Sequence, residues 1–310
     1  MAKLATGLAD DLLSLTVLAT TAPVLIAPAM DSQMYLNAAT QANVAILEER
    51  GFHFVGPAFG RLASGHVGPG RLTTPAEILG AVRQVAGRRG DLAGKRIVVT
   101  AGGTQEAIDP VRYVGNISSG KMGYALADAA RDRGAGVTLV SAPSALAAPY
   151  GVTFVPVRSA AEMRDAVLEA CNSADAVVMA AAVADFQPAT VAGQKIKKRE
   201  GMEGLTLELV RTPDILAELK PRRLVKVGFA AETNDLLANA KEKLERKGLD
   251  LIAANDVSAT DAGFGVDTNR VTLISRDGTT DSLPLMSKYE AANALLDRVA
   301  VLLQAREGHE

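Results

Sequence analysis

The sequence contains a single cysteine, Cys171, and no tryptophan among its 310 residues. One cysteine cannot form an internal disulfide or a cysteine-rich zinc site, and it suits a reducing compartment, so we expect a cytoplasmic protein. Aromatic residues make up only 4% of the chain, which excludes a stacking platform for single-stranded nucleic acid. No apolar run approaches the roughly 18 to 20 residues that span a bilayer, so no membrane partner is expected.

An excess of charge of one sign is also absent, because 33 basic and 35 acidic residues give a net charge of -2. Strong binding to nucleic acid through phosphate neutralisation is therefore not expected, although a local basic site remains open. The hydrophobic share of 48% is typical of a folded globular protein. A length of 310 residues is about twice the ~150 residues of an average domain and predicts two domains.

Gly and charged residues replace periodic apolar residues between Ala86 and Lys95, and we place the linker there. The predicted domains are residues 1–90 and 91–310. After the linker, short β-branched runs alternate with amphipathic stretches, which predicts a doubly wound, Rossmann-like α/β sheet. The expected strands are Arg96 to Thr100, Val137 to Ser141, Val152 to Val157, Ala176 to Ala180, Leu205 to Val210, Leu224 to Ala230 and Asp250 to Ala254. The expected helices are Ser119 to Arg133, Ala160 to Cys171, Asn234 to Lys247 and Ser287 to Gln304.

The end of the chain differs, because Asp277 and Gly278 form a turn signal between two extended runs and predict a hairpin over Arg270 to Leu285. The first ninety residues are less regular. Their patterns predict helices over Lys3 to Leu15 and Thr40 to Arg50, and strands over Val24 to Met30 and Phe52 to Pro57. Two strands make a poor parallel sheet, so this segment is interpreted as the back half of an α/β domain whose first strands are missing.

The segment from Ala101 to Gly123 follows the first strand of the second domain, where open α/β sheets bind ligands. It lacks the G-x-G-x-x-G dinucleotide fingerprint. The run "GNISSGKM" is one residue short of a P-loop, but Met122 cannot ligate Mg²⁺, so that match is rejected. Asn116, Ser118 and Ser119 remain as candidates to hold a phosphate or carboxyl oxygen. The alternative is an ordinary capped helix start.

Small residues Ala180 to Ala182 end a later strand and permit a flat ligand to approach the backbone. Asp185 follows them, where it could hold a ribose hydroxyl or a metal ion. The lysine-rich run Lys195 to Lys198 comes next, and lysine suits phosphate neutralisation on a movable loop. The alternative for this run is solvated surface.

A third candidate combines Phe229, expected at a strand end, with Lys243 and Lys247. The two lysines are four residues apart and share one helix face, where a phosphate chain could bridge them. The alternative is pairing with Glu242 and Glu245 along the same helix.

With these motifs, the chain resembles the family of bifunctional phosphopantothenoylcysteine decarboxylase/phosphopantothenate–cysteine ligases. The ligase half, from about Lys95 onward, carries "TAGGTQEAIDPVRYVGNISSGKMG", "AAAVADF", "KIKK", "TPDI", "GFAAET" and "ANDV" in the family's order. The resemblance implies Mg²⁺-dependent activation of 4′-phosphopantothenate by CTP as an acyl-cytidylate, which cysteine then converts to the amide. It assigns Asn116 to the acyl-cytidylate, Lys195 to a catalytic mobile loop and Asp185 to a possible Mg²⁺ contact. The positions that it implies for CTP are Met179, Ala180, Ala181, Asp185, Lys195, Pro213, Asp214, Ile215, Leu216, Phe229, Lys243 and Lys247.

In this scheme, Asn116, Ser118 and Ser119 contact the acid substrate, and the family implies a homodimer through the ligase domain. The first segment resembles only the second half of the family's FMN-dependent decarboxylase, through "APAMDSQMY" and "LASGHVGPGR". Asp31 stands at the family's substrate-binding Asn position, and Ser64 stands at its proton-donor Cys position. A serine hydroxyl is a far weaker acid than a thiol. The family's flavin phosphate loop would precede Met1, so the expectation is a truncated decarboxylase domain that does not retain FMN.

Two other classes of function remain open. A nicotinamide-dependent oxidoreductase could use the same kind of sheet, although the dinucleotide fingerprint is missing. A non-catalytic flavin-binding or assembly module could use the first ninety residues for oligomer contacts alone. Whether UTP or ATP replaces CTP is also left open by the sequence.

Overall fold

The computed structural model describes the chain apart from residues 198–202, 233–235, 257–264 and 309–310. It forms two compact units, Met1–Arg89 (unit 1) and Gly90–Glu310 (unit 2). The boundary expected from composition lay between residues 90 and 91. In the described part of the chain, every helix is too short or too polar to cross a membrane.

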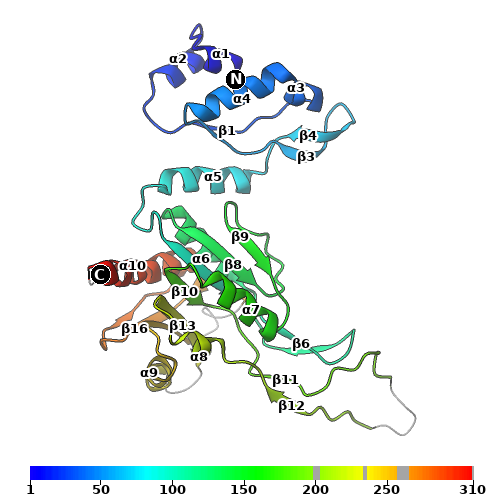
Figure 1. Cartoon of the computed structure of the whole chain (residues 1–310), viewed down its shortest axis with the longest axis vertical. Helices are drawn as coiled ribbons and strands as arrows, with labels where there is room; N and C mark the ends of the chain where they lie inside the picture. The colour runs from blue at the N-terminus through cyan, green and yellow to red at the C-terminus, as the bar shows by residue number, and fades with distance from the viewer. Residues whose placement is uncertain (198–202, 233–235, 257–264, 309–310) are drawn as a thin grey trace. The chain divides into compact units, whose positions relative to one another are not determined.

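Unit 2 is built on an eight-stranded sheet with the order β17-β16-β14-β13-β10-β5-β8-β9 (Figure 1). Six neighbouring strands, from β14 to β9, are parallel. In chain order they follow the 3-2-1-4-5-6 arrangement of a Rossmann sheet, so the predicted doubly wound fold is confirmed. The strands are β5 (Arg96–Ala101), β8 (Gly136–Ser141), β9 (Thr153–Pro156), β10 (Ala176–Met179), β13 (Val225–Glu232), β14 (Leu251–Asp256), β16 (Val271–Ser275) and β17 (Thr280–Ser282).

Helices cover both faces of this sheet because successive strand residues point to opposite sides. Val99 and Val178 belong to the core packed by α6 (Lys121–Asp132) and α10 (Lys288–Glu307). Val98 and Val177 belong to the opposite core, packed by α7 (Ala160–Ala170) and α8 (Ile215–Leu219). Helix α9 (Leu236–Lys247) extends that second layer over β14. The predicted start of α9 at Asn234 lies outside the described residues.

The predicted C-terminal hairpin is confirmed by β16 and β17, which pair antiparallel beside β14. Gly278 has a φ of 89°, and the Asp277 carboxylate accepts the Thr279 N–H at 2.9 Å. A short antiparallel pair, β15 (Thr268–Asn269) and β18 (Met286–Ser287), leads into α10.

Two small hairpins form a projection from unit 2, shown by β6, β11 and β12 in Figure 1. Strands β6 (Gln105–Ala107) and β7 (Tyr113–Gly115) pair with each other, as do β11 (Phe186–Pro188) and β12 (Leu209–Arg211). The predicted strand over Leu205 to Val210 was therefore wrong as a member of the main sheet. Only its last residues form a strand, and they are exposed because no layer of the core covers them.

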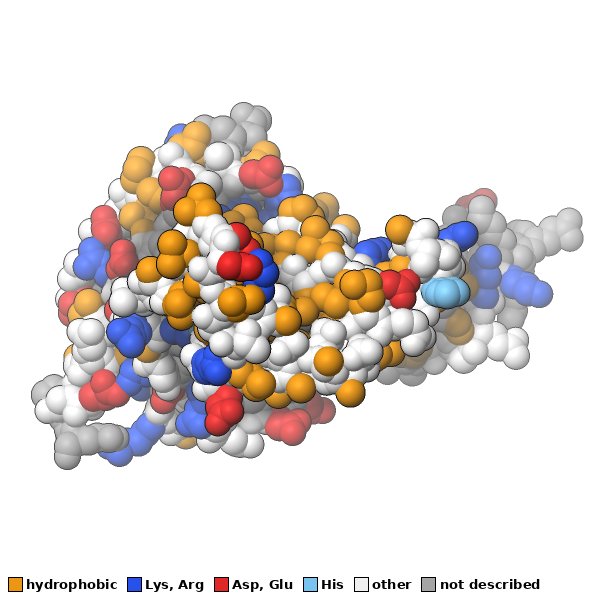
Figure 2. Space-filling model, turned by 90° about the horizontal axis from the view of Figure 1, so that it is seen from above, with side chains coloured by type: hydrophobic (Ala, Val, Ile, Leu, Met, Phe, Trp, Pro, Cys, Tyr) orange, Lys and Arg blue, Asp and Glu red, His pale blue; other side chains and the backbone are white. Residues whose placement is uncertain are grey.

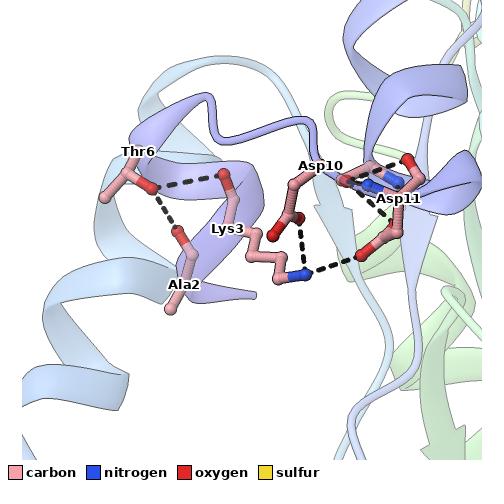
Figure 3. Close-up of polar contacts among 6 residues, drawn as sticks. Ala2, Lys3, Thr6, Asp10 and Asp11 are labelled. Atoms are coloured by element: carbon pink, nitrogen blue, oxygen red, sulfur yellow. Dashed lines mark hydrogen bonds and ion pairs between the residues drawn. The ribbon is translucent and has the colours of Figure 1, made fainter.

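Unit 1 begins with two short helices, so the predicted single helix from Lys3 to Leu15 was wrong. Helix α1 (Ala2–Thr6) ends at Gly7, whose φ of 72° continues no right-handed helix, and α2 (Leu12–Ala19) starts anew after Asp11. The Lys3 ammonium donates to Asp10 at 2.6 Å and to Asp11 at 2.7 Å across the turn (Figure 3). The break was signalled by Gly7 and by the N-capping potential of Asp11.

The remainder of unit 1 contains the two expected strands as a short parallel pair, β1 (Leu25–Ile26) and β2 (His53–Phe54). Helix α4 (Ala38–Glu49) matches the second predicted helix. The patterns missed α3 (Ser32–Leu36), α5 (Pro75–Gly87) and a hairpin of β3 (Ala58–Arg61) and β4 (Val67–Arg71). Leu12 and Leu13 of α2 are 82% and 74% exposed. Figure 2 shows many hydrophobic side chains on the side of the molecule that it draws.

Candidate functional site

The loops that follow β5 and β10 meet where the strand order reverses, which is where open α/β sheets bind ligands. Backbone bonds join them: the Ala182 N–H donates to the Gly102 carbonyl at 2.8 Å, and the Thr104 N–H donates to the Ala182 carbonyl at 3.2 Å. The buried Thr104 hydroxyl accepts the Ala184 N–H at 2.9 Å. These hydrogen bonds hold the two loops together at this edge of the sheet, and each loop lines a separate cavity.

The larger cavity, which we call the lysine cavity, measures about 840 Å³. It lies between the loop after β10, the entry to α8, β13 and one face of α9. Ten of the twelve positions predicted for CTP line it: Met179, Ala181, Asp185, Pro213, Asp214, Ile215, Leu216, Phe229, Lys243 and Lys247. Phe229 reaches it from the interior of β13, so its predicted position at a strand end was wrong; the strand continues to Glu232. Ala180 and Lys195 are not among the lining residues.

The two predicted lysines of α9 are half-buried, and the ammonium group of each contacts an oxygen atom of the protein in this cavity. Lys243 Nζ donates to the Phe229 carbonyl at 2.8 Å, and Lys247 forms an ion pair with Asp214. Burial raises the pKa of Asp214, but its bonds from Lys247 and from the Ala217 N–H outweigh burial and hold this pKa below its ordinary value. Glu242 forms an ion pair with Arg246, whereas the alternative expected from the sequence paired Glu242 and Glu245 with the two lysines.

Eight lining residues were not predicted: Val183, Ala184, Phe186, Arg211, Thr212, Asn239, Glu242 and Arg246. Helical spacing could have identified the last three, because Asn239 and Arg246 lie four and three positions from Lys243 on α9, and Glu242 lies four positions before Arg246. Arg211 gave no such signal, since only the pairing of β12 with β11 brings it to the cavity. The lining thus carries four cations, Arg211, Lys243, Arg246 and Lys247, against three carboxylates, Asp185, Asp214 and Glu242. This excess of positive charge favours a ligand that carries several negative charges.

Among the described residues, no group of three or more His, Cys, Asp or Glu side chains is placed to hold a metal ion without a bound ligand. Mg²⁺ that enters with a nucleotide needs only one or two protein carboxylates besides the phosphate oxygens. Asp185, exposed at the rim of the lysine cavity, fits that limited role. Its contact with Mg²⁺ stays a prediction.

A second cavity, the serine cavity, measures about 640 Å³ and contains Asn116, Ser118, Ser119 and Lys121. The Ser118 hydroxyl accepts the Gly120 N–H at 3.3 Å, and the Ser119 hydroxyl accepts the Lys121 N–H at 3.4 Å. These bonds lie in the turn before α6, whose N-cap residue Gly120 has no side-chain cap, so the alternative of an ordinary side-chain-capped start was wrong. Both serines line a space at the N-terminus of this helix. Gly123 lets α6 approach β5, since a Cβ there would lie 2.6 Å from the Ala101 Cβ.

Asn116 stands at the boundary of the two cavities. Its side chain lines the serine cavity, while its Nδ2 donates to the carbonyl of Val183, which lines the lysine cavity, at 3.1 Å. The exposed Lys195 lies outside the lining of both cavities. One chain therefore brings Asn116 to the serine cavity and Asp185 and Lys243 to the lysine cavity, while Lys195 lines neither.

In unit 1, the structure brings the two predicted positions into contact: the Ser64 hydroxyl donates to Asp31 at 2.6 Å. This bond and the Gln33 N–H lower the pKa of Asp31, which favours its carboxylate form. The two positions therefore provide a carboxylate and a hydroxyl group, and neither provides a thiol. The chain's one thiol, Cys171, is buried in unit 2, where burial raises its pKa to about 11.

The expectation that unit 1 does not retain FMN stays a prediction. A cavity of about 570 Å³ in this unit has Lys3, Arg50 and Arg88 among its lining residues. Each already has a partner: Lys3 binds Asp10 and Asp11, Arg50 donates to the Ala5 carbonyl at 2.7 Å, and Arg88 contacts His53. A flavin phosphate would have to displace one of these contacts.

Comparison with known proteins adds independent information. A family model described as "DNA/pantothenate metabolism flavoprotein C-terminal domain" matches residues 92–302, and one described as "Flavoprotein" matches residues 1–87. A coenzyme A biosynthesis bifunctional protein CoaBC from Bacillus subtilis is 50% identical over 305 residues, which cover 97% of this chain and 75% of that protein. A cysteine/cysteine sulfinic acid decarboxylase from an unknown prokaryotic organism is 43% identical over 309 residues, covering 97% of this chain and 86% of that protein. A crystal structure of the C-terminal domain of a CoaBC protein aligns with a TM-score of 0.60 and 41% identity, over 70% of this chain and 99% of that chain.

Proposed function

Because the chain belongs to the family of coenzyme A biosynthesis bifunctional proteins, we propose that unit 2 is a CTP-dependent phosphopantothenate–cysteine ligase. The observation that carries the proposal is the contact of Asn116 with Val183, which joins the lysine cavity to the serine cavity at the switch point of the sheet. Two anionic substrates can therefore be held on either side of one amide.

In the proposed reaction, the lysine cavity binds the triphosphate and the serine cavity binds the acid substrate. The carboxylate of 4′-phosphopantothenate attacks the α-phosphorus of CTP, pyrophosphate leaves, and the amine of cysteine then displaces CMP from the acyl-cytidylate. Two anions approach each other in the first step, so cations must neutralise the developing charge. Lys243 and Lys247 are already placed against oxygen atoms, and they exchange these partners for phosphate oxygens.

Asn116 suits the mixed anhydride because its amide can donate to a carbonyl or phosphate oxygen and accept from an amine. Mg²⁺, when bound with the nucleotide, supplies further positive charge to the phosphates, with Asp185 as its protein contact. Lys195 supplies a cation from outside the cavity. Its position in the structure supports a site completed by movement of its segment or by a second copy of the chain.

The test is pyrophosphate release by the purified chain with CTP, Mg²⁺, 4′-phosphopantothenate and cysteine. We expect release that requires the acid substrate, and a loss of about 30- to 150-fold in Lys195→Ala and Asn116→Ala if each contact contributes about 2 to 3 kcal/mol. Wild-type turnover in both variants would remove these residue assignments. A nicotinamide-dependent absorbance change in place of pyrophosphate would favour the oxidoreductase alternative.

We also propose a homodimer in which each site contains Asn116 of one subunit and Lys195 of the other. Mixing Asn116→Ala with Lys195→Ala, after dissociation and reassembly, then restores about a quarter of the wild-type sites, because half of the dimers are mixed and each has one intact site. A mixture as inactive as its two components places both residues in one subunit's site.

For unit 1, the Asp31–Ser64 pair supports a segment without the thiol acid of the decarboxylase reaction. We expect colourless protein with no bound FMN and no decarboxylation of phosphopantothenoylcysteine. Yellow protein that releases CO₂ from this substrate contradicts that expectation. The exposed leucines of α2 favour assembly as a second candidate role for unit 1, and Leu12→Lys with Leu13→Lys should then lower the native mass.

A further inference from the structure

Lys195 follows the β11 strand in a segment without regular secondary structure, so its backbone depends on other elements for hydrogen bonds. The tip of the β6–β7 hairpin supplies them. The Ala192 N–H donates to the Ile108 carbonyl at 2.9 Å, and the Ile196 N–H donates to the Asp109 carboxylate at 3.1 Å. These two bonds lie on either side of Lys195.

Arg112 completes the contact at Ile196. Its guanidinium donates to the Ile196 carbonyl at 3.0 Å and forms a two-point contact with Asp109. Both backbone groups of Ile196 are thus held by one ion pair, 84 to 87 residues earlier in the sequence. We call Asp109 and Arg112 the hairpin clamp.

The Asp109 side chain is fully buried and accepts several N–H groups at once. Besides Ile196 and the Arg112 guanidinium, it accepts the backbone N–H groups of Val111 at 2.8 Å and Arg112 at 2.9 Å. The bonds from Arg112, which are the strongest influence, hold the pKa of Asp109 well below its ordinary value. The carboxylate is therefore a fixed acceptor at neutral pH, and its geometry is determined by the hairpin.

The same hairpin is anchored at its base. Buried Glu106 accepts the Ala160 N–H at the start of α7 at 2.9 Å, and β7 leads directly into Asn116. One braced hairpin therefore connects Asn116 to the segment that carries Lys195 of the same chain, and in the proposed homodimer these two residues serve the two different sites. A displacement of about 1 Å in a reacting group can cost about 100-fold in rate, so such bracing matters for turnover.

From this geometry we propose that Asp109, acting with Arg112, is a positioning residue that holds the backbone beside Lys195 for the ligase reaction. The inference rests on the proposed function of unit 2. Asp109 touches no substrate in this account. It acts on the reaction only through the place and mobility of Lys195.

The experiment uses Asp109→Asn, which keeps one acceptor oxygen for the turn but replaces the oxygen shared by Arg112 and Ile196 with a donor. The matched control is Asp277→Asn, since Asp277 also accepts a backbone N–H at the tip of a hairpin, and within the described residues this bond is to Thr279 rather than to residues 192–196. Each variant is made in the wild-type background and in Lys195→Ala. Pyrophosphate release gives kcat and the KM for CTP, and limited trypsin digestion gives the rate of cleavage after Lys195.

We expect Asp109→Asn to lower kcat about 10- to 100-fold with less than about a threefold change in the KM for CTP, because the lysine cavity is untouched. Cleavage between Lys195 and Ile196 should accelerate about tenfold or more, since the bonds that hold Ile196 are lost. In the Lys195→Ala background, Asp109→Asn should cause no further loss of kcat, because both changes act through one side chain. Asp277→Asn should match the wild type in all three measurements.

An active wild type whose kcat and cleavage rate are unchanged by Asp109→Asn overturns this inference alone. A loss of kcat that adds fully to that of Lys195→Ala also overturns it, because Asp109 then acts by another route. A wild type that releases no pyrophosphate overturns the proposed function and the inference together.

Discussion

Replacing Lys243 with Met tests whether the lysine cavity binds the triphosphate. Methionine keeps an unbranched apolar stem against α9 but removes the ammonium group, which lies 2.8 Å from the Phe229 carbonyl oxygen. A hydrogen bond from a charged donor contributes about 1.5 to 3 kcal/mol, and 1.4 kcal/mol corresponds to a tenfold change. The expected loss of kcat/KM for CTP is therefore roughly 10- to 150-fold.

The control is Lys241→Met, because Lys241 is an exposed residue of the same helix that does not line the cavity. Pyrophosphate release is measured for both variants over a range of CTP concentrations, with thermal unfolding recorded in parallel. Lys241→Met should retain wild-type kcat/KM. Equal losses in the two variants would contradict phosphate binding by Lys243, since a general effect of positive charge on α9 would then explain them.

Two further predictions concern stability. Gly123→Ala should lower the free energy of unfolding by about 1 to 3 kcal/mol, because its new Cβ would lie 2.6 Å from the Ala101 Cβ. Gly136→Ala should change it little, since the nearest atom to its new Cβ is 3.8 Å away, and equal chemical denaturation midpoints would count against this packing argument. The Arg133 guanidinium holds the pKa of Asp91 below its ordinary value, so this pair stabilises the fold above the unfolded pKa and loses that contribution as pH falls through the folded one. Between about pH 5 and pH 3, wild-type stability should fall more steeply than that of Asp91→Asn, and parallel curves would contradict the sign.

The buried strands of unit 2 could be predicted because their β-branched runs leave no polar face, as at Val98 and Val99. The run at Leu205 to Val210 differs, because Thr206 and Glu208 alternate with its leucines, a pattern that indicates a strand with one exposed face. Its pairing with β11 outside the main sheet could not be predicted, since local sequence does not record the partner of a strand. In unit 1, by contrast, Gly7 did signal a helix end that the overall periodicity hid.

Helical spacing correctly placed Lys243 and Lys247 in one cavity, because a period of 3.6 residues fixes which side chains share a face. The partner of Lys247 could not be predicted in the same way, since Asp214 is 33 residues away and meets it only through the packing of α8 and α9. The contact of Asp109 with Ile196 spans 87 residues and depends on two hairpins. Contacts of this kind follow from tertiary structure rather than from any local pattern.

The central claim is that unit 2 couples cleavage of CTP to ligation of an acid and an amine. The most direct measurement follows pyrophosphate, CMP and the cysteine amide together in one reaction of the purified chain, supplied in turn with CTP, UTP and ATP. We expect equal amounts of the three products with CTP, and pyrophosphate only when 4′-phosphopantothenate is present. Release of pyrophosphate without the acid, or no product with any nucleotide, would contradict it.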